Sequence, residues 1–146
     1  MNQPANQKIT PLSGEMMNGI EARRKWVRDH YPQNAEENYK PLDGKLKLLD
    51  VILKSGWIKP DETVKLQCLG ITLGDALAQK LDLHWVQVED EYGTDPALRY
   101  AETSIIIFPM TLISKRIERG EQVDAYHLFN VMVEGIQKVI ADRNVT

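Results

Sequence analysis

Cysteine, histidine and long apolar runs are all scarce in this sequence. Cys68 is the only cysteine among 146 residues, which excludes an internal disulfide and a zinc site built from several thiolates. The three histidines lie far apart on different predicted elements, so no metal-binding spacing such as HExxH occurs. The most apolar run, residues 104–110, is much shorter than the roughly 20 residues that a membrane-spanning helix needs. We therefore expect no metal, no cofactor and no membrane association.

An excess of positive charge is also lacking. The formal net charge is -3, whereas a protein that neutralises many phosphates is usually basic, so we expect no nucleic-acid partner. Residues 1–11 are polar and lack the cationic and apolar stretches of a secretory signal, which favours a cytoplasmic location. Hydrophobic residues make up 42% and charged residues 27% of the chain, close to globular averages.

Recognisable catalytic motifs are absent as well. The sequence has no GxSxG, no phosphate-cradling loop and no neighbouring cysteine and histidine. Cys68 lies among Leu66, Leu69 and Ile71, and this apolar setting favours a buried thiol over a reactive nucleophile. We predict no catalytic residue.

The apolar pattern predicts one α+β domain over residues 13–146, preceded by a mobile tail over residues 1–12. Apolar residues recur at helical spacing in five segments: 13–30, 41–54, 60–81, 109–120 and 124–140. Strands are predicted at 84–90 and 104–108, with a loop at 91–96; residues 97–100 are a candidate for a short further strand. The expected fold is a small antiparallel sheet packed against about five helices, in the order α-α-α-β-β-α-α.

Two glycines stand four residues apart in the third predicted helix. Each of Gly70 and Gly74 costs roughly 1 kcal/mol relative to alanine in an exposed helix interior. We expect another backbone, from a helix or the sheet, to approach this glycine face closely; contact with a ligand is the alternative. The glycine face and the apolar last helix also leave open a homodimer.

Three segments together carry a family resemblance. They are Gly70-Ile71-Thr72-Leu73-Gly74-Asp75, the run from Leu83 to Arg99, and Phe108-Pro109-Met110-Thr111-Leu112-Ile113-Ser114-Lys115-Arg116. In this order they resemble the bacterial domain of unknown function 3806 family, over roughly Leu46 to Ile140. The resemblance implies no reaction. In its size and general character the chain is also similar to small immunity-type proteins that neutralise a toxin; this similarity is an analogy only.

The densest polar cluster is predicted at the loop between the first two strands. It contains Glu89, Asp90, Glu91, Asp95 and, beyond them, Arg99. Four carboxylates in seven residues could form a solvated hairpin end with Arg99 paired locally, a partner-binding patch, or a site for a hard cation or for acid–base chemistry. Their spacing does not match a helix-loop-helix calcium loop.

Aromatic residues flank this acidic cluster. Trp85 faces opposite to Val86 and Val88 in the predicted strand, so it is either covered by a helix or exposed beside Tyr92. Tryptophan, tyrosine and arginine dominate binding hot spots. We therefore favour a non-enzymatic interaction protein that binds a protein partner, such as a basic toxin. The predicted partner-binding residues are Trp85, Glu89, Asp90, Glu91, Tyr92, Asp95 and Arg99.

The competing hypothesis is a hydrolase, or a protein that binds a metal or a small ligand, with a cleft between the sheet and the helices. It would use Glu89, Asp90, Arg99 and His84. It predicts a carboxylate with a strongly shifted pKa or a bound metal.

Overall fold

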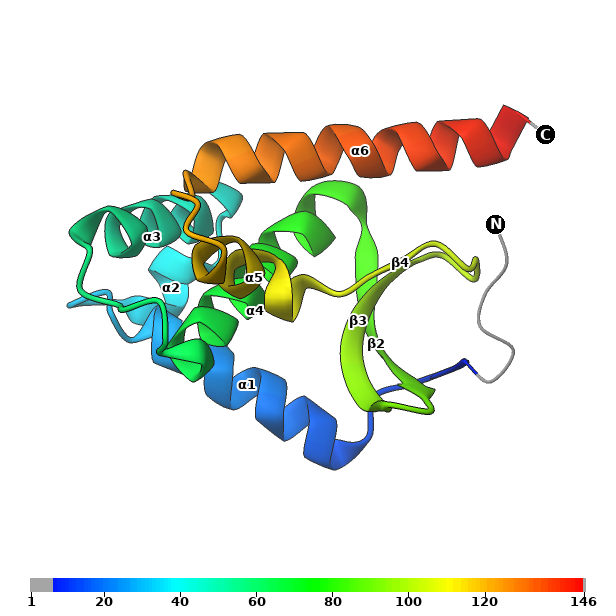
Figure 1. Cartoon of the computed structure of the whole chain (residues 1–146), viewed down its shortest axis with the longest axis horizontal. Helices are drawn as coiled ribbons and strands as arrows, with labels where there is room; N and C mark the ends of the chain where they lie inside the picture. Colours follow the sequence, from blue (N-terminus) through cyan, green and yellow to red (C-terminus); the bar gives the residue numbers. More distant parts are fainter. Residues whose placement is uncertain (1–6, 146) are drawn as a thin grey trace.

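A computed structural model describes residues 7–145 (Figure 1). The described residues form six α-helices and one four-stranded antiparallel sheet, so the domain is α+β, as predicted. The helices are α1 (Gly14–Arg28), α2 (Ala35–Tyr39), α3 (Leu42–Ser55), α4 (Thr63–Leu81), α5 (Leu112–Glu118) and α6 (Ala125–Val145), and a single 3-10 turn, η1 (Pro109–Thr111), precedes α5. The strands are β1 (Lys8–Thr10), β2 (Leu83–Asp90), β3 (Gly93–Tyr100) and β4 (Ile106–Ile107), in the spatial order β1-β2-β3-β4.

Helix α4 is the centre of the fold. Every residue from Cys68 to Leu77 is buried, because α1, α3, α5, α6 and η1 surround the helix and β2 packs against it. A helix that is apolar on all sides belongs in a core rather than at a surface. In Figure 1, α1 lies on one side of α4 and α6 crosses on the other, while the sheet stands at one end of the helical part.

Local sequence signals fix several helix ends. The Ser13 hydroxyl accepts a hydrogen bond from the Met16 amide at 3.1 Å and so caps the amino terminus of α1. Asp124 caps α6 in the same way, through the His127 amide at 2.9 Å. At the end of α3, Gly56 adopts a positive φ of 72°, which glycine allows without strain.

The expected close approach to the glycine face is confirmed. A Cβ added at Gly70 would lie 2.4 Å from the Met110 carbonyl oxygen and 2.7 Å from that of Pro109, so the backbone of η1 sits directly on the helix. At Gly74 the neighbours are side chains, the indole of Trp85 and the ring of Pro109, both within 2.8 Å of such a Cβ. The glycine face is therefore filled from within the chain and offers no surface to a second copy.

The amino-terminal part differs from the prediction. Residues 8–10, assigned to a mobile tail, form β1, which pairs antiparallel with residues 87–89 of β2. A three-residue edge strand is too short to show alternation in the sequence, and its pairing partner lies almost 80 positions away. Residues 1–6 of the predicted tail lie outside the described residues.

Other element boundaries also differ. Strand β3 begins at Gly93, so most of the predicted loop 91–96 is strand, and it includes Pro96. Because β4 pairs only with Leu98 and Arg99, β3 has a free edge at Pro96, where proline is tolerated. The predicted strand 104–108 is reduced to Ile106–Ile107, the helix predicted from residue 60 begins at Thr63, and the short helix α2 was not predicted.

The two faces of the sheet have different surroundings. Leu83, Trp85 and Leu98 pack into the main core with the helices, whereas Val86, Val88 and Ala97 form a small separate cluster. No helix within residues 7–145 has the length and apolar character needed to cross a membrane.

Candidate functional site

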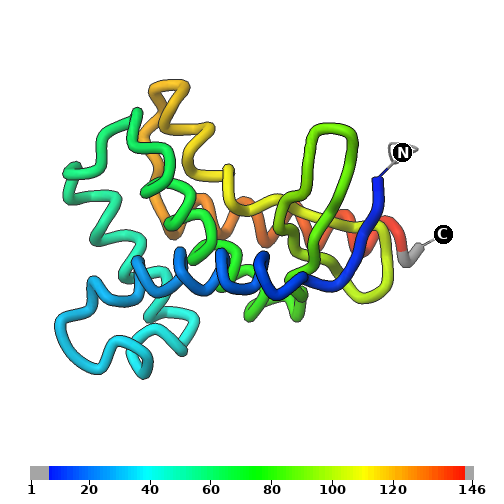
Figure 2. Tube along the Cα trace, turned by 90° about the horizontal axis from the view of Figure 1, so that it is seen from below, coloured from blue at the N-terminus to red at the C-terminus, as the bar shows by residue number. Residues whose placement is uncertain are grey.

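The predicted acidic loop is an exposed hairpin end. Its turn, between β2 and β3, places Tyr92 in solvent with 90% of its surface exposed, and Glu89, Glu91 and Asp95 are exposed beside it. The Asp90 carboxylate accepts a hydrogen bond from the Tyr92 amide at 2.8 Å, which fixes the turn. We call Glu89, Asp90, Glu91, Tyr92 and Asp95 the acidic tip. In Figure 2 the β2–β3 hairpin stands out from the helical part of the chain.

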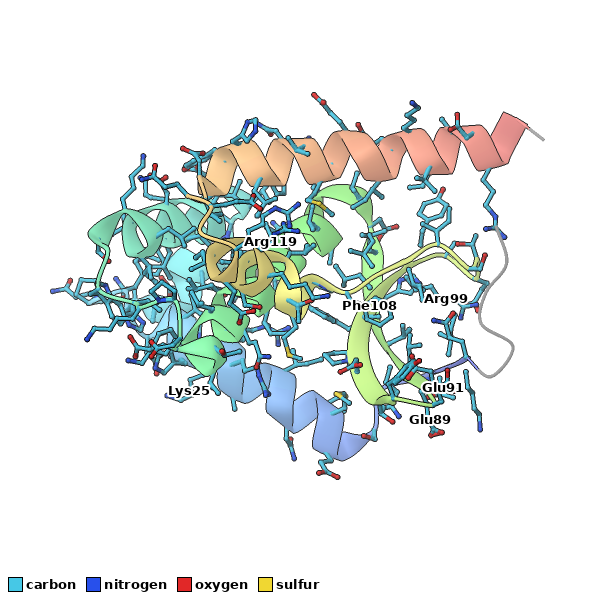
Figure 3. The ribbon with its side chains drawn as sticks, in the orientation of Figure 1. Lys25, Glu89, Glu91, Arg99, Phe108 and Arg119 are labelled. Carbon is cyan, nitrogen blue, oxygen red and sulfur yellow. The ribbon has the colours of Figure 1, made fainter. Side chains whose placement is uncertain are left out.

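Arg99 does not belong to the acidic tip. Its Nε donates to the Thr103 carbonyl at 2.6 Å, and its guanidinium pairs with Glu102 at 3.5 Å, so it stabilises the turn between β3 and β4. Figure 3 shows Arg99 well away from Glu89 and Glu91. His84 lies opposite Arg99 in the β2–β3 register, far from the tip, and is exposed. Arg99 is paired locally, as expected for a hairpin end. Its partner, however, is Glu102, which lies at the end of β3 opposite to the acidic tip.

The acidic residues do not gather into a cation site. Among residues 7–145, no group of three or more histidine, cysteine, aspartate or glutamate side chains is arranged to hold a metal ion. Asp95 lies opposite Val88 in the β2–β3 register, next to Glu89. Because neighbouring side chains of a strand point to opposite faces of the sheet, Glu89 and Asp95 lie on different faces. The tip is therefore a surface of exposed negative charge and not a coordination shell.

Trp85 is half-buried and faces the helices. Its indole lies over Gly74, and its Nε1 donates to the Asp75 carboxylate at 3.0 Å. The sequence left open whether a helix covers Trp85 or the indole is exposed beside Tyr92; in the structure α4 covers it. The indole is thus part of the interior and does not lie beside Tyr92.

Asp75 is the centre of a buried polar network that the sequence did not reveal. Its carboxylate, 9% exposed, accepts four hydrogen bonds, two on each oxygen. The donors are Arg24 Nε (2.6 Å), Arg24 Nη2 (2.8 Å), the Tyr39 hydroxyl (2.6 Å) and Trp85 Nε1 (3.0 Å). The Thr72 hydroxyl lies 3.1 Å from that of Tyr39. A carboxylate has about four acceptor positions, so this one is saturated.

Electrostatics fix the protonation of this network. The hydrogen bonds to Asp75 raise the pKa of Arg24 well above its usual value. Burial, with the charge of Asp75 as the second cause, raises the pKa of Tyr39 far above that of an exposed phenol. Both groups therefore keep their protons throughout the neutral range and remain donors to Asp75. Saturated in this way, Asp75 acts as a structural anchor between α1, α2, α4 and β2.

A polar pocket of about 510 Å³ opens beside this network. It is formed by α1, α2, α4 and the start of α3. Each residue that lines it carries a polar or charged group: Glu21, Arg24, Arg28, Glu36, Tyr39, Lys40, Lys45, Asp75 and Gln79. A second, smaller pocket of about 200 Å³ lies between α1, η1 and the hairpin, with Arg23 and Asp95 in its wall. We call the larger one the α1–α4 pocket.

Lys45 is buried in the wall of the α1–α4 pocket, with 7% of its surface exposed. Its ammonium donates to the Lys40 carbonyl and to Gln79 Oε1, both at 2.7 Å, and lies 5.0 Å from the centre of the Tyr39 ring. None of these partners is charged. Burial lowers the pKa of Lys45, because the ammonium form loses hydration there.

The sequence carried one signal for this site. Asp75 is the only charged residue between Cys68 and Leu77, in a run that is otherwise apolar or small. A lone carboxylate in such a run requires a buried partner. Its partners Arg24 and Tyr39 come from α1 and α2, where many charged residues compete, and Trp85 comes from β2, so their identity could not be read from spacing.

Cys68 is buried in the core, as expected, and burial raises the pKa of its thiol. Because the thiolate is the reactive form, we expect no more than slow modification by a thiol reagent in the native protein at pH 8. One equivalent should react rapidly once the chain is unfolded in guanidinium chloride. Rapid stoichiometric labelling without denaturant would contradict this placement and revive the nucleophile hypothesis.

These features define an α+β domain built around a buried central helix, with a saturated carboxylate network and an acidic hairpin. The chain belongs to the family described as Domain of unknown function (DUF3806), which it matches over residues 45–129, more than half its length. This bears out the resemblance seen in the sequence. No curated protein matches the chain.

A solved structure shares the fold. The crystal structure of a protein from Bacteroides thetaiotaomicron VPI-5482, at 1.50 Å resolution, superposes with a TM-score of 0.77 at 17% sequence identity. The match covers 91% of this chain and 49% of the other, so this chain spans about half the length of that protein. At this identity the likeness shows a common fold.

Proposed function

We propose that this domain is a protein-binding module whose acidic tip engages a basic partner. The observation that carries the proposal is the exposure of Tyr92 among carboxylates that have no basic partner: none of the ion pairs among the described residues involves Glu89, Asp90, Glu91 or Asp95. A tyrosine offers a large contact area with a polar end, and a patch of one charge accelerates the encounter with an oppositely charged surface.

The proposed surface is smaller than the sequence suggested. Trp85 is engaged by Asp75, and Arg99 by Thr103 and Glu102, so the proposal leaves both residues out. Without Arg99 the tip keeps only acidic and aromatic side chains, which strengthens its preference for a basic partner. The narrowest form of the proposal is an immunity-type role in which that partner is a toxin; its support is the charge of the tip and the small size of the domain.

The test compares capture of binding proteins from a lysate of the source cell by three forms of the chain. The tip variant carries Glu89→Gln, Glu91→Gln and Tyr92→Ala. The control, Glu37→Gln with Glu134→Gln, removes the same charge from exposed positions on α2 and α6. We expect the wild type and the control to retain a stoichiometric basic protein that the tip variant loses, and we expect retention to weaken as salt rises.

Two results would argue against the proposal. If the tip variant retained the partner as well as the wild type does, the interface would lie elsewhere. If the control variant lost the partner too, the loss would be explained by the change in overall charge and not by the tip. Circular dichroism of all three forms checks that the fold is intact, since every substituted side chain is exposed.

A further inference from the structure

We propose that the α1–α4 pocket binds a small polar organic acid with a single negative charge, whose carboxylate contacts Lys45 and Arg28. This inference is independent of the acidic tip, which lies on a different part of the molecule. It rests on the uncompensated charge in the pocket wall, on two incompletely used donors and on the composition of the rim.

The first observation is the charge of Lys45. An ammonium buried without a counter-ion is costly, and proteins usually pair it with a carboxylate. Lys45 forms no such ion pair among the described residues, and its hydrogen bonds to the Lys40 carbonyl and Gln79 use two of its three protons. Apart from the face of the Tyr39 ring, whose centre lies 5.0 Å from Nζ, the described residues offer the third proton no acceptor, so an anion inside the pocket could accept it.

The nearest buried carboxylate does not supply the missing charge. All four acceptor positions of Asp75 are taken, and its charge is matched by Arg24 in a two-pronged ion pair. The attraction of Lys45 to Asp75 is accordingly opposed by repulsion from Arg24. As a unit the Asp75–Arg24 pair is neutral, so the pocket keeps the positive charge of Lys45.

The second donor is Arg28. Its side chain is only 14% exposed, and one guanidinium nitrogen, Nη1, pairs with Glu21 at 3.1 Å. Its Nε is buried and has no hydrogen-bond acceptor among residues 7–145. Nε itself is shielded from the pocket, but Arg28 lines the pocket and its Nη2 forms no hydrogen bond among the described residues, so Nη2 is the donor open to a carboxylate there.

The rim limits the charge and size of the ligand. Glu21 and Glu36 line the same pocket and would repel a multiply charged anion. The pocket is open to solvent, and its volume of about 510 Å³ is large enough to admit a small molecule. Every lining residue carries a polar or charged group, so a hydrophilic ligand would find hydrogen-bond partners there. These features together select a singly charged organic acid with further polar groups.

The test is a titration of the ¹⁵N-labelled full chain with sodium acetate, the smallest probe of this class, followed by amide NMR. Sodium chloride at equal ionic strength is the control for screening. We expect saturable shifts at Tyr39, Lys40 and Gln79 with acetate and none with chloride. The pKa of the Lys45 ammonium should rise when acetate binds, because a nearby negative charge stabilises the protonated form.

Matched variants locate the effect. Lys45→Met should weaken acetate binding about tenfold or more, which corresponds to the loss of one charged hydrogen bond. Lys47→Met removes the same charge from an exposed position on the same helix and should bind acetate like the wild type. Should Lys45→Met fail to fold, Arg28→Gln provides the same comparison, and the pKa measurement on the wild type needs no variant.

Three outcomes would overturn the proposal. The first is an absence of saturable shifts with acetate. The second is unchanged binding in a folded Lys45→Met variant, or equal loss in Lys47→Met. The third is tighter binding of inorganic phosphate than of acetate at neutral pH, which would contradict the preference for a single charge. Retention of acetate binding by the acidic-tip variant would show that the two surfaces act separately.

Discussion

Asp75→Ala is expected to lower the free energy of unfolding by about 3 kcal/mol, because removing one partner of a buried ion pair leaves the other charge uncompensated. The substitution removes both hydrogen bonds between Arg24 and Asp75 and leaves the Trp85 indole without its acceptor. The Tyr39 hydroxyl keeps only the Thr72 hydroxyl as an acceptor. Guanidinium unfolding followed by circular dichroism measures the change. An effect of this size is a large fraction of the stability of an ordinary domain.

The control for this prediction is Asp61→Asn. Asp61 is exposed before α4, so its neutralisation should change stability by no more than about 0.5 kcal/mol. If Asp75→Ala were as mild as the control, the network would not anchor the fold. Replacing Asp75, Arg24 and Tyr39 together by apolar residues could change the free energy of unfolding very little. That result would remain compatible with the anchor, because a buried ion pair replaced as a unit often costs little stability.

Gly70→Ala is the second substitution with a large expected effect. The new methyl group would lie 2.4 Å from the Met110 carbonyl oxygen, a backbone atom that cannot swing aside as a side chain can. Either α4 or η1 must move, and overpacking of this kind costs roughly 1–3 kcal/mol. We expect the upper part of this range, since α4 is packed on every side. Thermal and guanidinium unfolding both measure the loss.

The same substitution at another helix should have the opposite sign. Gly135 lies in α6, and a Cβ added there meets no atom within 4 Å, so Gly135→Ala should stabilise the protein by about 0.5–1 kcal/mol through helix propensity. A stabilising Gly70→Ala would show that η1 is free to withdraw from α4. The pair of variants therefore separates close backbone approach from the general cost of glycine in a helix.

The sequence predicted those parts of the fold that local patterns determine. The apolar spacing of α1, α3 and α4, the Ser13 cap and the alternation in β2 were sufficient to place these elements, because each signal lies within the segment it describes. Strands β1 and β4 are short and are defined by pairing with distant residues. Their existence depends on tertiary contacts that periodicity cannot show.

The same distinction, between local patterns and contacts of distant residues, decides which candidate sites could be predicted. The exposed acidic tip could be predicted, since a run of charged residues beside a turn is visible in the sequence. The Asp75 network could not, because Arg24, Tyr39 and Asp75 are separated by up to 51 positions and meet only when α1 and α2 pack on α4. Trp85 shows the limit most clearly: its strand position was predicted, but the choice between solvent and Asp75 depends on which face of the sheet the helices cover.

The Asp75 network joins the part of the chain that matches the family model to a part that lies outside the match. Asp75 and Trp85 lie inside the region that matches the family, residues 45–129, whereas Arg24 and Tyr39 lie before it. The family region by itself would enclose a carboxylate whose counter-ion is supplied from outside that region. In this chain α1 and α2 thus complete the charge balance of the family core, and a 45–129 segment on its own would lack the counter-ion of Asp75.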